Sequence, residues 1–453
     1  MIRAELAHLL RLALPIVVTQ LSQMGMGVAD TIMAGRYGAI DLAGVALGAN
    51  VFWPTVMLLA GVIMAVVPSV SQLHGAGRHA GAGEVVRQAL WIAVAGGALL
   101  ILLYRNTPPL LAALGVDPQA IPVAGAYLDA LSWGVLPLLG YFALRYLCEG
   151  MSWTTPAMVV AFVGLLAKIP LNYLFIYGAG PLPAMGGVGC GWASALVMWL
   201  ELLVLVAVVA NSRIRLTGLF SRVSRPAPAQ ILRLLKLGVP IGLTIFLEFS
   251  LFSLVTLLIG RLGVNAVAAH QIATNVGGLT FMVPMAIGTA VAVRVGYNVG
   301  AGRLDDARRS GWVALGVALA FALIVGTLLY LFRGAIAGLY SNDSAVTAVA
   351  MELMVFVAVY QLVDDTQVTA MGALRGFKDT RTPLVIALFA YWAVGFPVGM
   401  TLGFGWVELP AFVGVRGFWV GLSLGLCVAA VVLTSRFAWL SRRHGRVLQL
   451  AAR

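Results

Sequence analysis

The sequence contains few charged residues, and this shortage excludes a fold surrounded by water. Only 10% of its 453 residues are charged, while 61% are hydrophobic; a soluble domain has roughly 25% charged residues. A helix needs about 20 mostly apolar residues to cross a bilayer, and such runs recur from one end of the sequence to the other. The composition therefore predicts an all-α membrane protein.

Cysteine is also scarce, and the motifs of enzymes are missing. Cys148, Cys190 and Cys427 lie far apart in apolar runs, which excludes a CxxC pair and a disulfide framework. The five histidines show no metal-ligand spacing. Two Gly-Ala-Gly-Arg loops, at 75–78 and 300–303, lack the Gly-Lys-Ser/Thr ending of a phosphate-binding loop. We expect no enzyme activity and no cofactor other than a coupling ion.

Hydropathy predicts twelve membrane-spanning helices. Their expected ranges are 11–34, 45–72, 88–105, 121–144, 156–178, 187–210, 236–260, 270–293, 310–332, 346–374, 384–405 and 414–437.

The distribution of basic residues predicts the orientation of these helices. With the N-terminus inside the cell, 23 of the 29 Lys and Arg residues lie on the cytoplasmic side and 5 on the outside. Because cytoplasmic loops carry the excess of positive charge, both termini are predicted to be cytoplasmic. Attraction to anionic lipids of that leaflet accounts for the net charge of +12 without a nucleic-acid partner.

The second half of the sequence repeats the first at an offset of 225 residues. The matching pairs include Pro15-Ile16 with Pro240-Ile241, Gly35-Arg36 with Gly260-Arg261, Asn50-Val51 with Asn275-Val276, and the two Gly-Ala-Gly-Arg loops. Six helices per half place both repeats in the same orientation. We therefore expect two pseudo-symmetric six-helix lobes, residues 1–222 and 223–453, around a central cavity, an arrangement typical of alternating-access transporters.

A few charges interrupt the predicted helices, and each needs a physical reason. A charge at the bilayer centre costs at least about 2.5–3.5 kcal/mol on insertion scales. The candidates are Asp30, Lys168, Glu201, Glu248, Asp364 and Asp365. We interpret Lys168 as structural, either extending to the interface or neutralising an acid, and Glu201 as a packing or interfacial residue.

Glu248 lies about halfway along the seventh predicted helix, and its repeat mate is Gln23. Both halves thus place a polar group at the same depth, facing the expected cavity. Since no basic residue is nearby in that helix, an ionised Glu248 would favour binding a proton or a metal cation. This behaviour suits an ion-coupling site.

A polar stripe marks the tenth predicted helix. Tyr360, Asp364 and Gln367 follow one another at positions i, i+4 and i+7, which places them on one helix face. Asp365 lies beside this face, about 100° around the helix. We predict that Asp364 and Gln367 face the cavity, with Asp365 at its margin.

The first half offers a second candidate site. Asp30 lies late in the first predicted helix, and its repeat mate is Val255, so the repeat itself does not require an acid there. Asn172 is four residues after Lys168 on the same helix face and can supply a carbonyl oxygen to a cation. Asp30 is predicted to bind a cation or a proton.

Several of these motifs together resemble the multidrug and toxic compound extrusion (MATE) family, in particular its NorM-like bacterial branch. They are the stretch 30–36, the paired Gly-Ala-Gly-Arg loops, and Leu-Arg-Gly-Phe-Lys-Asp-Thr-Arg-Thr-Pro at 374–383. The resemblance covers nearly the whole chain. It implies a bacterial inner-membrane transporter, expected to be a monomer, that exports lipophilic organic cations in exchange for Na⁺ or H⁺ and contributes to antibiotic resistance.

The resemblance also implies roles for individual residues. The cation site of the second lobe is similar to Tyr360, Glu248 and Asp364, with the two acids as Na⁺ ligands if Na⁺ is the coupling ion. The acid of the first lobe matches Asp30, with Asn172 beside it. Some relatives carry another acid where this chain has Ile176, which favours the second-lobe site here.

An alternative function remains open at this stage. A flippase for lipid-linked or amphiphilic precursors could be built on a related two-lobe fold. Such a protein would be expected to place Arg and Lys in its cavity, whereas Lys168 stands nearly alone among acids.

Overall fold

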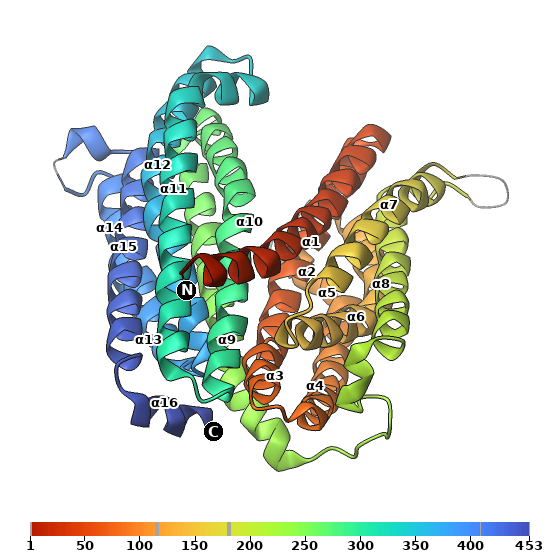
Figure 1. Ribbon diagram of the computed structural model, residues 1–453. Coiled ribbons are helices and arrows are strands. Elements are labelled where there is room, and N and C mark those ends of the chain that lie inside the picture. The colour runs from red at the N-terminus through yellow and green to blue at the C-terminus, as the bar shows by residue number, and fades with distance from the viewer. Residues whose placement is uncertain (1, 114–116, 179–182, 408, 453) are drawn as a thin grey trace. The chain divides into compact units, whose positions relative to one another are not determined.

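The computed structural model is helical and contains no strand in the residues that it describes, 2–113, 117–178, 183–407 and 409–452 (Figure 1). The first half contains α1 (Ile2–Tyr37), α2 (Ala39–Ile63), α3 (Val66–Gly75), α4 (His79–Arg105), α5 (Thr107–Ala113), α6 (Ile121–Gly150), α7 (Thr155–Tyr177), α8 (Gly187–Ala210) and η1 (Arg213–Thr217). The second half contains α9 (Pro228–Ile259), η2 (Gly260–Leu262), α10 (Val264–Gly300), α11 (Leu304–Tyr340), α12 (Ser344–Gly376), α13 (Arg381–Ala387), η3 (Leu388–Gly395), α14 (Phe396–Gly403), η4 (Pro410–Phe412), α15 (Val415–Leu440) and α16 (His444–Ala451).

Twelve helical stretches of the described chain are long and apolar enough to cross a membrane, which confirms the predicted number. Two of them are composite. The second, Ala39–Gly75, joins α2 and α3, and the eleventh, Arg381–Gly403, joins α13, the π-helical turn η3 and α14. The protein is therefore an all-α, multi-pass membrane protein.

The chain folds into two compact units whose limits differ from the two halves of the sequence. The first unit is Leu14–Gly242. The second unit is Leu243–Arg453 together with the start of α1, up to Ala13. Both α1 and α9 therefore pass from one unit to the other. Pro15 and Pro240, which are repeat mates, lie inside these helices near the crossings, where a proline removes a backbone hydrogen bond. The division of the chain into six-helix lobes 1–222 and 223–453 stays a prediction.

The paired Gly-Ala-Gly-Arg loops adopt the same turn in both units. Gly77 and Gly302 have φ values of 69° and 74°, a left-handed conformation that glycine adopts without steric cost. In each loop the following Arg N–H donates to a carbonyl five residues back, at 2.9 Å for Arg78 and 2.8 Å for Arg303. The two loops are helix C-terminal caps.

Close packing of α10 against α12 positions the acids of the second unit. A Cβ added at Gly372 of α12 would lie 2.1 Å from the Gly288 carbonyl oxygen of α10. Small residues of this kind let helix backbones approach in membrane proteins. The approach fixes the face of α12 that carries the acidic residues.

Candidate cation sites

Glu248 and Asp364 meet at one amide group in the second unit. The Gln367 Nε2 donates to Asp364 Oδ1 at 3.2 Å and to Glu248 Oε1 at 3.5 Å. Asp364 and Gln367 are buried, and Glu248 is half-buried. The amide thus joins the acid of α9 to the acid of α12.

Aromatic side chains hold this bridge in place. The Tyr391 hydroxyl, from the π-helical turn η3, donates to Gln367 Oε1 at 2.6 Å; π-helical turns occur frequently at functional sites. Tyr360 lies within hydrogen-bonding reach of Asp364. Its ring packs edge-on against Trp419 and Phe252, with centroid distances of 5.9 and 6.3 Å.

Asp365 belongs to a separate polar cluster on the neighbouring face of α12. Gln361 Nε2 donates to Asp365 Oδ1 at 2.7 Å, and Thr280 of α10 donates to Gln361 Oε1 at 2.8 Å. Asp365 Oδ2 is buried without a hydrogen-bond partner. The structure therefore does not connect Asp365 directly to the bridge between Glu248 and Asp364.

Glu248, Asp364 and Asp365 lie outside the described salt bridges, and Arg375 of α12 is the basic residue whose charge acts on Glu248. Among the described residues, neither Glu248 nor Asp364 nor Asp365 forms an ion pair. The described chain also contains no group of three or more His, Cys, Asp or Glu residues that could hold a metal ion. A cation here would therefore rely on the two carboxylates and the Tyr360 hydroxyl oxygen, because Gln367 directs its Nε2 toward the acids and its Oε1 toward Tyr391.

Asp30 in the first unit has a basic partner, in contrast to the acids above. Lys168 Nζ lies 2.9 Å from Asp30 Oδ1 and also donates to the Cys190 carbonyl, at 3.2 Å, and to the Ser194 hydroxyl. Asn172 Nδ2 donates to Asp30 Oδ1 at 2.7 Å. The predicted neighbours Asp30 and Asn172 do meet, but the ammonium group of Lys168 is between the acid and α8.

Gln23 lies beside a second buried ion pair of the same unit. Arg145 Nε donates to Glu149 Oε1 at 2.7 Å, and its Nη1 donates to Gln23 Oε1 at 3.4 Å. Glu201 is buried, with 4% of its surface exposed, and its Oε1 has no hydrogen-bond partner. Its burial against neighbouring helices agrees with the interpretation of Glu201 as a packing residue.

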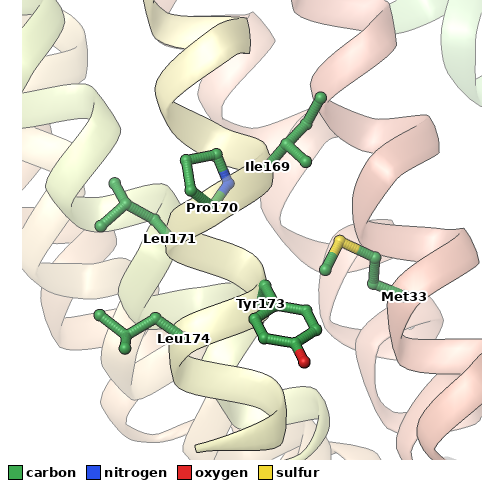
Figure 2. Close-up of a pocket in the computed structure, with 6 residues that line it drawn as sticks. All are labelled: Met33, Ile169, Pro170, Leu171, Tyr173 and Leu174. Carbon is green, nitrogen blue, oxygen red and sulfur yellow. The ribbon is translucent and has the colours of Figure 1, made fainter. Parts of the chain in front are cut away.

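The first unit also has an apolar hollow on another face of α7. It has a volume of about 590 Å³ and lies between Met33 of α1 and α7 (Figure 2). Its α7 residues are Ile169, Pro170, Leu171, Tyr173 and Leu174. Ile169 and Tyr173 are exposed, whereas Lys168 and Asn172 of the same helix are buried. The six residues that line the hollow include no acid.

Several contacts of these sites were missed by the sequence reasoning. Tyr391, Gln361, Thr280 and Trp419 carried no signal of their own, because single polar or aromatic residues are common in membrane helices. The i, i+4 spacing of Arg145 and Glu149 was the one available signal, since residues so spaced share a helix face.

Comparison with known proteins finds a match in each half of the sequence repeat. The sequence matches the MatE family profile over residues 15–174 and 240–401, two stretches that begin at the repeat-related Pro15 and Pro240. It is 45% identical over 448 residues to the multidrug resistance protein PmpM of Pseudomonas aeruginosa, covering 98% of this chain and 94% of that protein. It is 40% identical to the multidrug resistance protein NorM of Aliivibrio fischeri, covering 98% of this chain and 96% of that protein.

The fold is likewise similar to solved structures. The eukaryotic MATE transporter AtDTX14 has a TM-score of 0.86 and 21% sequence identity, and the alignment covers 98% of this chain and 99% of that one. The family resemblance drawn from the motifs is thereby confirmed. The chain belongs to the MatE family and is a membrane transporter, not an enzyme.

Proposed function

We propose that this transporter exports lipophilic organic cations in exchange for Na⁺ or H⁺, and that Glu248 and Asp364 bind the ion and the substrate in turn. The observation that carries the proposal is the pair of acids bridged by Gln367, neither of which forms a salt bridge among the described residues. Two carboxylates in an apolar environment need a compensating cation. The multidrug resistance proteins with similar sequences support export of small molecules.

The exchange follows from competition for one pair of carboxylates. On the outward-facing side, Na⁺ or H⁺ neutralises Glu248 and Asp364 and weakens their attraction for a cationic substrate, which then leaves. After the lobes reorient, the ion dissociates toward the cytoplasm and the acids bind a new substrate. The ion drives this cycle only through different affinities for the two states. Both termini are cytoplasmic and the membrane is the bacterial inner membrane in this proposal.

The buried basic residues Arg145 and Lys168 of the first unit do not favour the flippase alternative. Arg145 is paired with Glu149, and Lys168 with Asp30, so neither presents an uncompensated positive charge to a polyanionic lipid head group. An ion-coupled exporter of cations agrees better with this charge distribution.

Efflux of ethidium from dye-loaded proteoliposomes, under separately imposed Na⁺ and pH gradients, tests the proposal. Asp364→Asn and Glu248→Gln should each slow ion-driven efflux by about tenfold or more, because a tenfold change corresponds to about 1.4 kcal/mol, less than the loss of one close charge partner. Asp365→Asn is the matched control. It changes the adjacent acid in the same way but leaves the Gln367 bridge intact, so efflux should continue.

The gradient that accelerates efflux identifies the coupling ion. Normal efflux by both Asp364→Asn and Glu248→Gln would exclude these acids as the coupling site. Accumulation of lipid precursors in cells lacking the transporter, without any dye efflux by the reconstituted protein, would instead favour the flippase.

A further inference from the structure

One buried acid of the first unit has no ion-pair partner among the described residues. The described buried charges of this unit are Asp30, Arg87, Arg145, Glu149, Lys168 and Glu201, and Arg87 pairs with Glu84. Arg145 pairs with Glu149, and Lys168 pairs with Asp30. Glu201 therefore remains without an ion-pair partner in the described chain, and its Oε1 is buried without a hydrogen bond. A buried carboxylate in this situation is costly unless a cation reaches it.

Lys168 occupies a set of oxygens that also suits a small cation. Its ammonium group has three N–H donors, and the three acceptors are Asp30 Oδ1, the Cys190 carbonyl and the Ser194 hydroxyl. Asn172 adds a carbonyl oxygen, Oδ1, that is buried without a partner. Carboxylate, carbonyl and hydroxyl oxygens are the ligands of hard cations. The Lys168 ammonium thus takes the place that an external cation would need at Asp30.

Glu201 lies about two helical turns along α8 from the Lys168 partner Ser194, and α7 borders both positions. Gly164 is one turn before Lys168 on α7, and a Cβ added there would lie 2.8 Å from Glu201 Oε1. Helical side chains incline toward the N-terminus of their helix, which for Lys168 is the direction of Gly164. On α8, Ser194 and Glu201 are seven residues apart and share one face. Arg145 and, to a smaller extent, Lys168 attract Glu201 electrostatically.

We infer that Lys168 is an internal counter-cation that transfers from Asp30 to Glu201 when an external Na⁺ or proton replaces it at Asp30. In the structure Lys168 compensates Asp30 and no ion pair compensates Glu201. After the transfer the external cation compensates Asp30 and Lys168 compensates Glu201, so one external cation is bound for each transfer. Glu201 is a positioning residue in this scheme, because it acts on the Asp30 site through Lys168. The inference rests on the proposed antiport, which supplies the external cation.

Zero-length cross-linking of the purified transporter by dicyclohexylcarbodiimide tests the transfer. The reagent activates a carboxyl group as an O-acylurea; the neighbouring lysine amine attacks the acyl carbon, and the urea leaves as the amide bond forms. Peptide mass spectrometry then gives the ratio of Lys168–Glu201 to Lys168–Asp30 links. The ratio is measured with and without Na⁺, at neutral and at acidic pH.

The ratio should rise about tenfold on addition of Na⁺ or acid, whichever supplies the coupling ion, because a ligand shifts a two-state equilibrium by its differential affinity. Asp30→Asn should leave the Lys168–Glu201 link as the product under all conditions, and Glu201→Gln should leave the Lys168–Asp30 link. An unchanged ratio in all four wild-type conditions, or no Lys168–Glu201 link in Asp30→Asn, would overturn the inference. The links form without transport, so the result stands apart from any failure of ion-driven efflux.

Discussion

The two units handle a buried acid in different ways at the level of single residues. In the second unit, Glu248 and Asp364 share one neutral amide and have no described ion pair. In the first unit, Asp30 already has the ammonium group of Lys168 at 2.9 Å. Glu248 and Asp364 therefore need a removable cation, whereas at Asp30 the chain itself supplies the cation. This difference makes Glu248 and Asp364 the stronger candidates for ion coupling.

Tyr391→Phe tests how the acid bridge is held. The substitution removes the hydroxyl that donates to Gln367 Oε1 at 2.6 Å and leaves a buried amide oxygen unpaired. Such a loss costs about 1–3 kcal/mol. We expect lower stability in denaturant unfolding and a higher ion concentration for half-maximal efflux, because Gln367 then orients less firmly. Tyr173→Phe, at a 61% exposed tyrosine, is the control; an equal effect of both changes would contradict this role of Tyr391.

At the level of the helices, the sequence predicted more of the fold than of the sites. Long apolar runs determine where helices cross the bilayer, so the number of spans was predictable. The face of a helix was also predictable, as for Asp364 and Gln367. Which residues of different helices meet was not, because periodicity carries no information about the partner helix. Lys168 and Asp30, for example, are 138 positions apart in the sequence.

Gly372→Ala tests the contact of α10 with α12. The added methyl group would lie 2.1 Å from the Gly288 carbonyl oxygen, and backbone cannot move aside as a side chain can. Overpacking typically costs about 1–3 kcal/mol, so the midpoint of thermal unfolding in detergent should fall. Gly316→Ala is the control, since nothing lies within 4 Å of its added Cβ. Alanine is favoured over glycine in a helix by about 1 kcal/mol, so this control should be neutral or stabilising. Matching losses in both variants would refute the packing argument.

At the level of the whole molecule, the repeat explains why two helices cross between the units. The repeat mates Pro15 and Pro240 lie inside α1 and α9. The start of α1 belongs to the second unit and the rest of α1 to the first, whereas the start of α9 belongs to the first unit and the rest of α9 to the second. In α9, Gly238 and Gly242 lie against the carbonyl groups of Val62 and Leu58. Sequence similarity between the halves reveals the duplication. It does not reveal that the two helix starts are exchanged between the units, because the sequence pattern would be the same with or without the exchange.

A double-mutant cycle on Glu5 and Arg294 measures how firmly the start of α1 is attached to the second unit. Both oxygens of Glu5 accept hydrogen bonds from Arg294, at 2.9 and 2.7 Å, and Ser310 donates to Oε1 at 2.6 Å. Both side chains are at most 15% exposed. Coupling between Glu5→Gln and Arg294→Gln should therefore reach about 1–3 kcal/mol in denaturant unfolding, the range of buried, bidentate pairs in contact.

Glu352 and Arg416 provide the matched control for this cycle. Arg416 also donates twice to its carboxylate, at 2.9 and 2.6 Å, but both side chains are nearly half exposed. Solvent screening reduces exposed pairs to at most about 1 kcal/mol, so the same cycle on this pair should give the smaller coupling. A coupling at Glu5 and Arg294 no larger than the control would show that apolar packing, including Leu9 and Ala13, holds the segment without help from the ion pair.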